Sequence, residues 1–206
     1  MKNYLKVKSL SKQSRYKVRF RRRREGKTDY RRRLRLLLSR KTRFVVRKTN
    51  RYITVQFIDY SEKGDITRVC VSSHILRKKY KWYYSLKNLP AAYVTGYIAG
   101  KKALKKGISE AIVDIGLQAS TKGNRIYAAV KGAIDAGVKI KCGEEVLPPM
   151  DRISGVHIAS YAKLLKEENP DLYNERFSKI ISQGKDPTNI VSEFNKLVEE
   201  VKSDYG

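Results

Sequence analysis

The sequence predicts an α/β fold: a mixed, mostly antiparallel sheet covered by helices, with a basic extended N-terminal arm and a helical C-terminal extension. Between residues 43 and 72, three strand-like segments follow one another with only turn signals between them. Between residues 91 and 136, two helical patterns enclose a short apolar strand, which gives the order β-β-β-α-β-α. Hydrophobic residues make up 41% of the 206 residues, which is enough to form a hydrophobic core, so we expect the many charged residues to lie on the surface of a folded domain.

Residues 1–27 are predicted to form the basic arm. They contain few apolar residues, no usable helical or strand period, and the block RFRRRR at 19–24. Such a segment cannot bury enough apolar surface to fold alone. We therefore expect an extended conformation that becomes ordered only against an anionic partner.

Residues 28–38 are predicted to form a short amphipathic helix. Thr28 is the expected N-cap, and Asp29 suits the first turn. Leu34, Leu37 and Leu38 have the i, i+3, i+4 spacing of one helix face. The opposite face carries Arg31, Arg32, Arg33 and Arg35.

Three strands are predicted next, at 43–49, 52–59 and 66–72. The first is β-branched, and the other two alternate apolar with polar residues. Asn50-Arg51 and residues 61–65 are turn signals, so we expect an antiparallel meander. Residues 74–89 then form a basic and aromatic connection.

The helix expected at 91–106 has one stripe of small residues that should let its backbone approach a sheet closely. These residues are Ala92, Gly96, Ala99, Gly100 and Ala103. A strand at 110–115 and a helix at 124–136 follow, the helix ending at Gly137. Beyond 148 the chain is acidic and reads as three helical pieces, broken at 169–170 and 184–187. The last piece is amphipathic and should dock on the core or on a neighbour. The predicted division is a basic arm (1–27), an α/β core (28–147) and a helical extension (148–206).

Positive charge is concentrated at one end of the chain. Of the 46 Lys and Arg residues, 21 lie in the first 50 positions, where only Glu25 and Asp29 oppose them. That segment therefore carries +19 of the formal net charge of +26, whereas the last 100 residues, with 13 basic and 15 acidic side chains, carry −2. This asymmetry indicates a polyanionic partner, and we expect that partner to be nucleic acid.

The arm mixes aromatic rings with guanidinium groups, a combination that binds phosphates and stacks on unpaired bases. A solvated arm or a nuclear import signal is the alternative. The candidate contact residues of the arm are Arg15, Tyr16, Lys17, Arg19, Phe20, Arg21, Arg22, Arg23 and Arg24.

Three other segments carry candidate RNA contacts. The hairpin tip offers Arg47, Lys48, Asn50 and Arg51, although an ordinary surface turn would look similar. The 77–88 stretch, read as a loop, offers Lys78, Lys79 and Trp82, with the equal alternative that Trp82 packs beneath the domain. The N-terminus of the helix near 124 offers Lys122, Asn124 and Arg125 for an RNA phosphate.

Catalytic and metal-site patterns are absent from the sequence. Residues 114–123 lie between a strand and a helix, but a phosphate loop would need glycine at Thr121 and a hydroxyl residue at Gly123, which excludes nucleotide hydrolysis by such a loop. The two cysteines and two histidines form no zinc or catalytic pattern, so we expect no enzyme, no cofactor and no metal. No signal peptide or membrane-length apolar run occurs, and we expect a soluble, cytoplasmic protein. A nucleic-acid enzyme and a DNA architectural protein remain the competing hypotheses.

Five segments carry a resemblance to a known family: RRRREGKTDY at 21–30, VVRKTNR at 45–51, PAAYVTG at 90–96, DIGL at 114–117 and GEEVLP at 143–148. Together they resemble the 5S-rRNA-binding protein of the large ribosomal subunit, the eighteenth universal large-subunit family, in its archaeal and eukaryotic form. The length and the compact core are similar to archaeal members.

The resemblance implies a structural, non-enzymatic role in the ribosome. It implies attachment of 5S rRNA to the central protuberance, contacts with large-subunit rRNA and with neighbouring ribosomal proteins, and no membrane or small-molecule substrate. It extends the candidate arm contacts to Lys27, Thr28 and Tyr30, to which we add the adjacent Arg31 and Arg32. The sequence YYSL at 83–86 differs from the glycine-rich family pattern, so no detailed contacts are carried over to the 77–88 loop.

Overall fold

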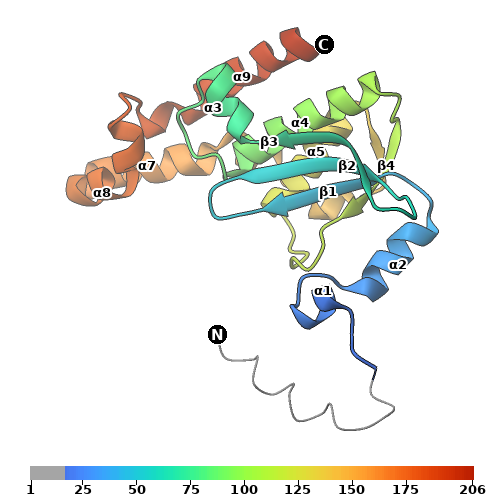
Figure 1. Cartoon of the computed structure of the whole chain (residues 1–206). Helices are drawn as coiled ribbons and strands as arrows, with labels where there is room; N and C mark the ends of the chain where they lie inside the picture. Colours follow the sequence, from blue (N-terminus) through green and yellow to red (C-terminus); the bar gives the residue numbers. More distant parts are fainter. Residues whose placement is uncertain (1–16) are drawn as a thin grey trace.

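The computed structural model describes residues 17–206 and contains a five-stranded mixed sheet of order β3-β2-β1-β4-β5 (Figure 1). Strands β1 (Arg43–Lys48), β2 (Ile53–Asp59) and β3 (Ile66–Ser72) form the predicted antiparallel meander. Strand β4 (Glu110–Asp114) lies parallel to β1, and β5 (Lys139–Ile140), which the sequence did not predict, lies parallel to β4. The α/β class with a mixed sheet is confirmed.

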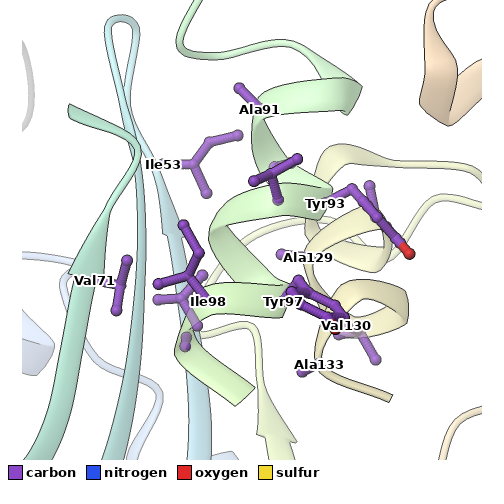
Figure 2. Close-up of a cluster of buried hydrophobic side chains, with 14 of the residues drawn as sticks. Ile53, Val71, Ala91, Tyr93, Tyr97, Ile98, Ala129, Val130 and Ala133 are labelled. Atoms are coloured by element: carbon purple, nitrogen blue, oxygen red, sulfur yellow. The ribbon is translucent and has the colours of Figure 1, made fainter. Parts of the chain in front are cut away.

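Helices α4 (Leu89–Lys105) and α5 (Arg125–Asp135) pack on one face of the sheet. Figure 2 shows α4 between the sheet and α5: Ile98 faces Ile53 and Val71, whereas Tyr97 lies on the side of Val130. All five of these side chains are buried. The other face of the sheet is not covered by α4 or α5.

The small-residue stripe of α4 approaches α5, and the expectation that it approaches the sheet is wrong for its two glycines. A Cβ at Gly96 would overlap the backbone carbonyl of Ala129, and one at Gly100 would lie 2.7 Å from the Cβ of Ala136. Gly132 of α5 is the reciprocal position, because a Cβ there would overlap the backbone carbonyl of Tyr93. The two helices therefore touch backbone to backbone.

The N-terminal part differs from the sequence prediction in two details. Residues 21–24, expected to be extended, form the single helical turn α1 (Arg21–Arg24). Helix α2 (Tyr30–Leu38) is capped by Asp29, not by Thr28, since the Asp29 carboxylate accepts hydrogen bonds from the backbone N–H groups of Arg31 and Arg32 at 3.0 and 3.1 Å. Helix α2 buries no residue, and Leu38 is 73% exposed.

The 74–89 connection is not an open loop. It begins with helix α3 (His74–Tyr80), which ends at Lys81 in the left-handed conformation (φ 51°). Trp82 and Tyr84 then pack against one another in the core, with ring centroids 4.8 Å apart.

The C-terminal part is helical, as predicted, with breaks at the two predicted positions and a further break at Gly155. Its elements are η1 (Glu144–Val146), α6 (Met150–Ser154), α7 (Val156–Glu168), α8 (Pro170–Ile181), η2 (Pro187–Asn189) and α9 (Ile190–Tyr205). The amphipathic α9 docks on the core: Phe194 is buried, and its ring centroid lies 6.0 Å from that of Tyr93 in α4. Among residues 17–206, no helix has both the length and the apolar character needed to cross a bilayer.

Candidate nucleic-acid interface

The open face of the sheet, helix α2 and the segment after β4 enclose a cleft of about 640 Å³. In Figure 1, α1 and α2 lie apart from the C-terminal helices α7, α8 and α9. Basic side chains outnumber acidic ones in the cleft lining, six to three. The basic ones are Arg22, Lys27, Arg32, Arg33, Arg43 and Arg47, and the acidic ones are Asp29, Asp65 and Asp114.

An ion-pair network forms the floor of the cleft. Arg43 of β1, only 3% exposed, lies between Asp65 (2.7 Å) and Asp114 (3.2 Å). Arg33 of α2 reaches the same Asp65 at 2.8 Å. Burial raises the pKa of the Asp65 carboxyl, but the hydrogen bond from Arg33 and the adjacent Arg43 guanidinium outweigh this and hold the pKa below its ordinary value. The network ties α2 to the sheet with charges that are already compensated.

Two predicted contact residues, Arg32 and Arg47, hold the segment after β4 in place. Arg47 donates to the backbone carbonyls of Val46 and Asp114 at 2.9 and 2.8 Å, and to the Asp114 carboxylate at 3.1 Å. Arg32 donates to the backbone carbonyl of Gly116 at 2.7 Å. A Cβ at Gly116, whose φ is +63°, would lie 3.0 Å from the guanidinium carbon of Arg47. Both arginines line the cleft, but part of their hydrogen-bonding capacity is used inside the protein.

The described part of the arm is exposed and strongly basic. Every residue from 17 to 24 is exposed, whereas Arg15 and Tyr16 lie outside the described residues. Phe20 is 69% exposed and lies against Tyr30, with ring centroids 4.9 Å apart. Arg22 donates to the Thr28 hydroxyl at 2.8 Å. The arrangement presents cations and a pair of rings next to the cleft.

The β1–β2 hairpin ends in an exposed polar tip. The Thr49 hydroxyl accepts from the backbone N–H groups of Arg51 and Tyr52, at 3.3 and 2.9 Å, which fixes the turn. Asn50 and Arg51 are exposed and Lys48 is half-buried. Their contact with RNA stays a prediction.

The α3 region corrects one predicted contact. Trp82 is 3% exposed, so it is a core residue, and the alternative that it packs beneath the domain is the one observed. Lys79 lies at a different surface, where its Nζ pairs with Asp204 at 2.7 Å and sits 5.2 Å from the ring centroid of Tyr205. Lys79 therefore helps to seat the end of α9, and the neighbouring Lys78 is exposed.

The start of α5 forms a third location, away from the lining of the cleft. Lys122 pairs with Glu145 at 3.2 Å, and both side chains are exposed. Arg125 donates to the backbone carbonyl of Lys87 at 2.9 Å. Asn124, at the N-cap, uses its side chain on the Thr121 hydroxyl (3.2 Å) and makes no capping hydrogen bond.

The sequence prediction missed several residues that line the cleft, among them Arg43, Asp65 and Gln118. One signal was present: Arg43 and Arg47 lie four residues apart on one strand and must share a face. Nothing local marks Asp65 or Asp114 as their partners. Residues 17–206 contain no group of three or more His, Cys, Asp or Glu side chains placed to hold a metal ion.

A family model and individual relatives identify the same family of proteins. Residues 14–111 and 107–142 match the family model described as ribosomal large subunit proteins 60S L5 and 50S L18. The large ribosomal subunit protein uL18 of Korarchaeum cryptofilum is 51% identical over 194 residues, covering 94% of this chain and 98% of the relative. The uL18 proteins of Saccharolobus solfataricus and Staphylothermus marinus are 48% and 50% identical, each over 93% of this chain and over 96% and 97% of the relative.

Proposed function

Since this chain belongs to the uL18 family of large ribosomal subunit proteins, we propose that it binds 5S rRNA and anchors it to large-subunit rRNA in the central protuberance. Membership itself means a structural role in the cytoplasmic ribosome, with ribosomal RNA and ribosomal proteins as partners and no enzymatic activity. The identity of the RNA, the place in the subunit and the contact residues belong to the proposal.

One observation carries the proposal: in residues 17–27, the described part of the arm, the positive charge is not neutralised by the acidic end of the chain. Residues 17–27 contain seven Lys and Arg residues. Within residues 17–206, the ion pairs of this segment are those of Arg21 and Lys27 with Glu25, its own single acid. Acidic residues of the C-terminal part pair instead with lysines outside the arm, as in Lys166 with Asp186 and Lys79 with Asp204. The arm therefore keeps an excess of cations for phosphate.

A second basic surface supports a bridging role. Lys102 and Lys105 of α4 lie beside the ring of Tyr205, with Nζ atoms 5.7 and 5.6 Å from its centroid, and the charge of the neighbouring Lys79 is paired with Asp204. In Figure 1 these elements lie apart from α1 and α2. Two separate cationic surfaces suit a protein that holds one RNA against another.

The test is filter binding of 5S rRNA by the full chain over a range of salt concentrations. Changing Arg21, Arg22, Arg23 and Arg24 together to Gln removes four exposed cations. If all four contact phosphates, the slope of log K against log[salt] falls by about 3, since each contact contributes about 0.7–0.9. Removing residues 1–27 weakens binding and flattens the slope further.

The matched control removes the same charge from the other end of the chain. Lys163, Lys179, Lys196 and Lys202 are exposed on α7, α8 and α9. Changing these four to Gln should leave the salt slope within about one unit of the unmodified protein. Equal slopes and affinities for both quadruple variants, or equal binding of duplex DNA and 5S rRNA, would refute the proposal.

A further inference from the structure

The cleft between α2 and the sheet is larger than phosphate binding requires. Contacts to a phosphate backbone need exposed cations on a surface, which the arm provides. A hollow of about 640 Å³ lies instead in the size range of sites for small organic groups, about 300–1,000 Å³. The cleft can therefore hold a small organic group as well as a phosphate.

The walls of the cleft are of two kinds. Apolar and aromatic side chains line the interior: Tyr30, Leu36, Val45, Ile58, Ile115 and Leu117. Of these, Leu117 is 53% exposed, although it borders a strongly basic surface. Arg22 and Arg32 supply positive charge from the helical side. Tyr30 is the aromatic residue of this lining, and an aromatic ring with guanidinium groups nearby is a usual setting for an unstacked base and its phosphate.

An unsatisfied polar atom lies in the same lining. No residue in the 17–206 range donates a hydrogen bond to the side-chain oxygen of Gln118, and this atom is buried. A buried acceptor without a protein donor is free to accept a hydrogen bond from a bound group. The exocyclic amino group of adenine, guanine or cytosine is a donor of the right kind.

The acidic residues of the cleft do not oppose a phosphate. Asp65 and Asp114 are engaged by Arg33, Arg43 and Arg47. Asp29 is used by the backbone N–H groups at the start of α2, as described above. The remaining excess of positive charge in the lining is available to the ligand.

We propose that this cleft binds a single unstacked nucleotide of the bound ribosomal RNA, with the base against the apolar wall and Gln118 and the phosphate beside Arg22 and Arg32. The inference rests on the proposed function, because it assumes that RNA lies on this face. It adds that the protein recognises an unpaired nucleotide as well as a phosphate backbone.

The main experiment fills the cleft without changing charge. Ile58 lines the cleft from β2, and Ile58→Trp should weaken 5S rRNA binding at least tenfold while the salt slope stays within one unit of the unmodified protein. The control is Ile66→Trp on the adjacent β3, a residue that is 51% exposed and lies outside the lining. It should change the affinity less than twofold.

A second variant keeps the test decisive if Ile58→Trp fails to fold. Gln118→Leu removes the unsatisfied oxygen, so we expect an unchanged or higher urea midpoint together with about tenfold weaker 5S rRNA binding. A residue with a purely structural role would not lower the affinity while leaving stability intact. Unchanged 5S rRNA affinity in Gln118→Leu and in a folded Ile58→Trp would overturn the proposal and leave the proposed function standing. Failure of the unmodified protein to bind 5S rRNA would instead overturn both.

A competition assay distinguishes the source of the nucleotide. The four nucleoside 5′-monophosphates are added to the complex of unmodified protein and 5S rRNA. We expect no displacement below millimolar concentration, because one isolated nucleotide lacks the phosphate contacts of the arm. Displacement by micromolar monophosphate, lost in Ile58→Trp, would identify the cleft as a site for free nucleotides and overturn the assignment to RNA.

Discussion

Changing Asp114 to Asn tests whether the ion-pair network organises the floor of the cleft. Asp114 is buried at the end of β4, where its carboxylate pairs with Arg43 at 3.2 Å and with Arg47 at 3.1 Å. It also accepts a hydrogen bond from the backbone N–H of Gly116 at 2.8 Å. Asparagine retains this acceptor and the side-chain shape, so the substitution removes mainly the charge.

The magnitude follows from the burial of the two groups. Breaking a buried ion pair by neutralising one partner costs about 3–5 kcal/mol, because the other charge is left uncompensated. Arg43 is buried but keeps Asp65 at 2.7 Å, so the lower end applies and we expect a loss of about 3 kcal/mol. With an m value of about 2–3 kcal/mol per molar urea, the unfolding midpoint falls by about 1–1.5 M.

Urea unfolding at pH 7, followed by far-UV circular dichroism, measures this change. Glu199→Gln, an exposed position on α9, removes the same unit of charge and should change the free energy of unfolding by less than about 0.5 kcal/mol. A loss for Asp114→Asn no larger than that of Glu199→Gln would refute the view that this carboxylate holds Arg43 in the sheet.

Two further predictions concern the packing and the pH dependence of the fold. Gly132→Ala should destabilise the protein by about 3 kcal/mol in the same urea assay, because the new Cβ overlaps the backbone of α4. The control is Gly143→Ala, where a Cβ meets no atom within 4 Å, and it should leave the stability unchanged. Equal effects of the two substitutions would contradict the backbone contact between α4 and α5. Burial, with smaller contributions from Glu193 and Asp186, raises the pKa of Tyr84 from 10.0 to about 12. The folded state therefore holds this proton more tightly than the unfolded state, so stability is intact below pH 10 and falls as the pH rises towards 12. Tyr84→Phe should reduce this alkaline loss of stability. An unchanged loss in the variant would contradict the role of Tyr84.

The strands of the meander could be predicted from the sequence because their signal is local. A β-branched run marks the first strand and alternation of apolar and polar residues marks the other two, and the bounds of β1, β2 and β3 agree with the prediction within one residue. The two-residue strand β5 has no such signal, since its pairing with β4 depends on how α5 returns the chain to the sheet.

Of the candidate contact residues, Trp82 is corrected by its burial, whereas RNA contact by the others stays a prediction. A mixture of basic and aromatic residues looks the same whether its rings are exposed, as at Phe20, or buried, as at Trp82. Burial depends on distant elements, here the packing of Trp82 and Tyr84 into the core. Contacts between residues far apart in the sequence likewise assign Arg47 to Asp114, which no spacing rule could reveal.

The division of the chain into arm, core and helical extension stays a prediction. The packing shows which parts of the extension share the hydrophobic core of the sheet. Ile153 of α6 and Leu197 of α9 belong to the same hydrophobic core as the sheet. Ala162, Leu165 and Tyr173 form a separate small cluster between α7 and α8. The helical extension is thus attached to the core at both of its ends.

The most direct test of the central claim is the identity of the RNA that crosslinks to this protein in intact ribosomes under ultraviolet light. Digestion of the crosslinked protein and sequencing of the attached RNA assigns each contact to a peptide. We predict 5S rRNA on the peptides that contain residues 17–47, and large-subunit rRNA on other peptides. Recovery of no 5S rRNA from the arm and cleft peptides would contradict the account.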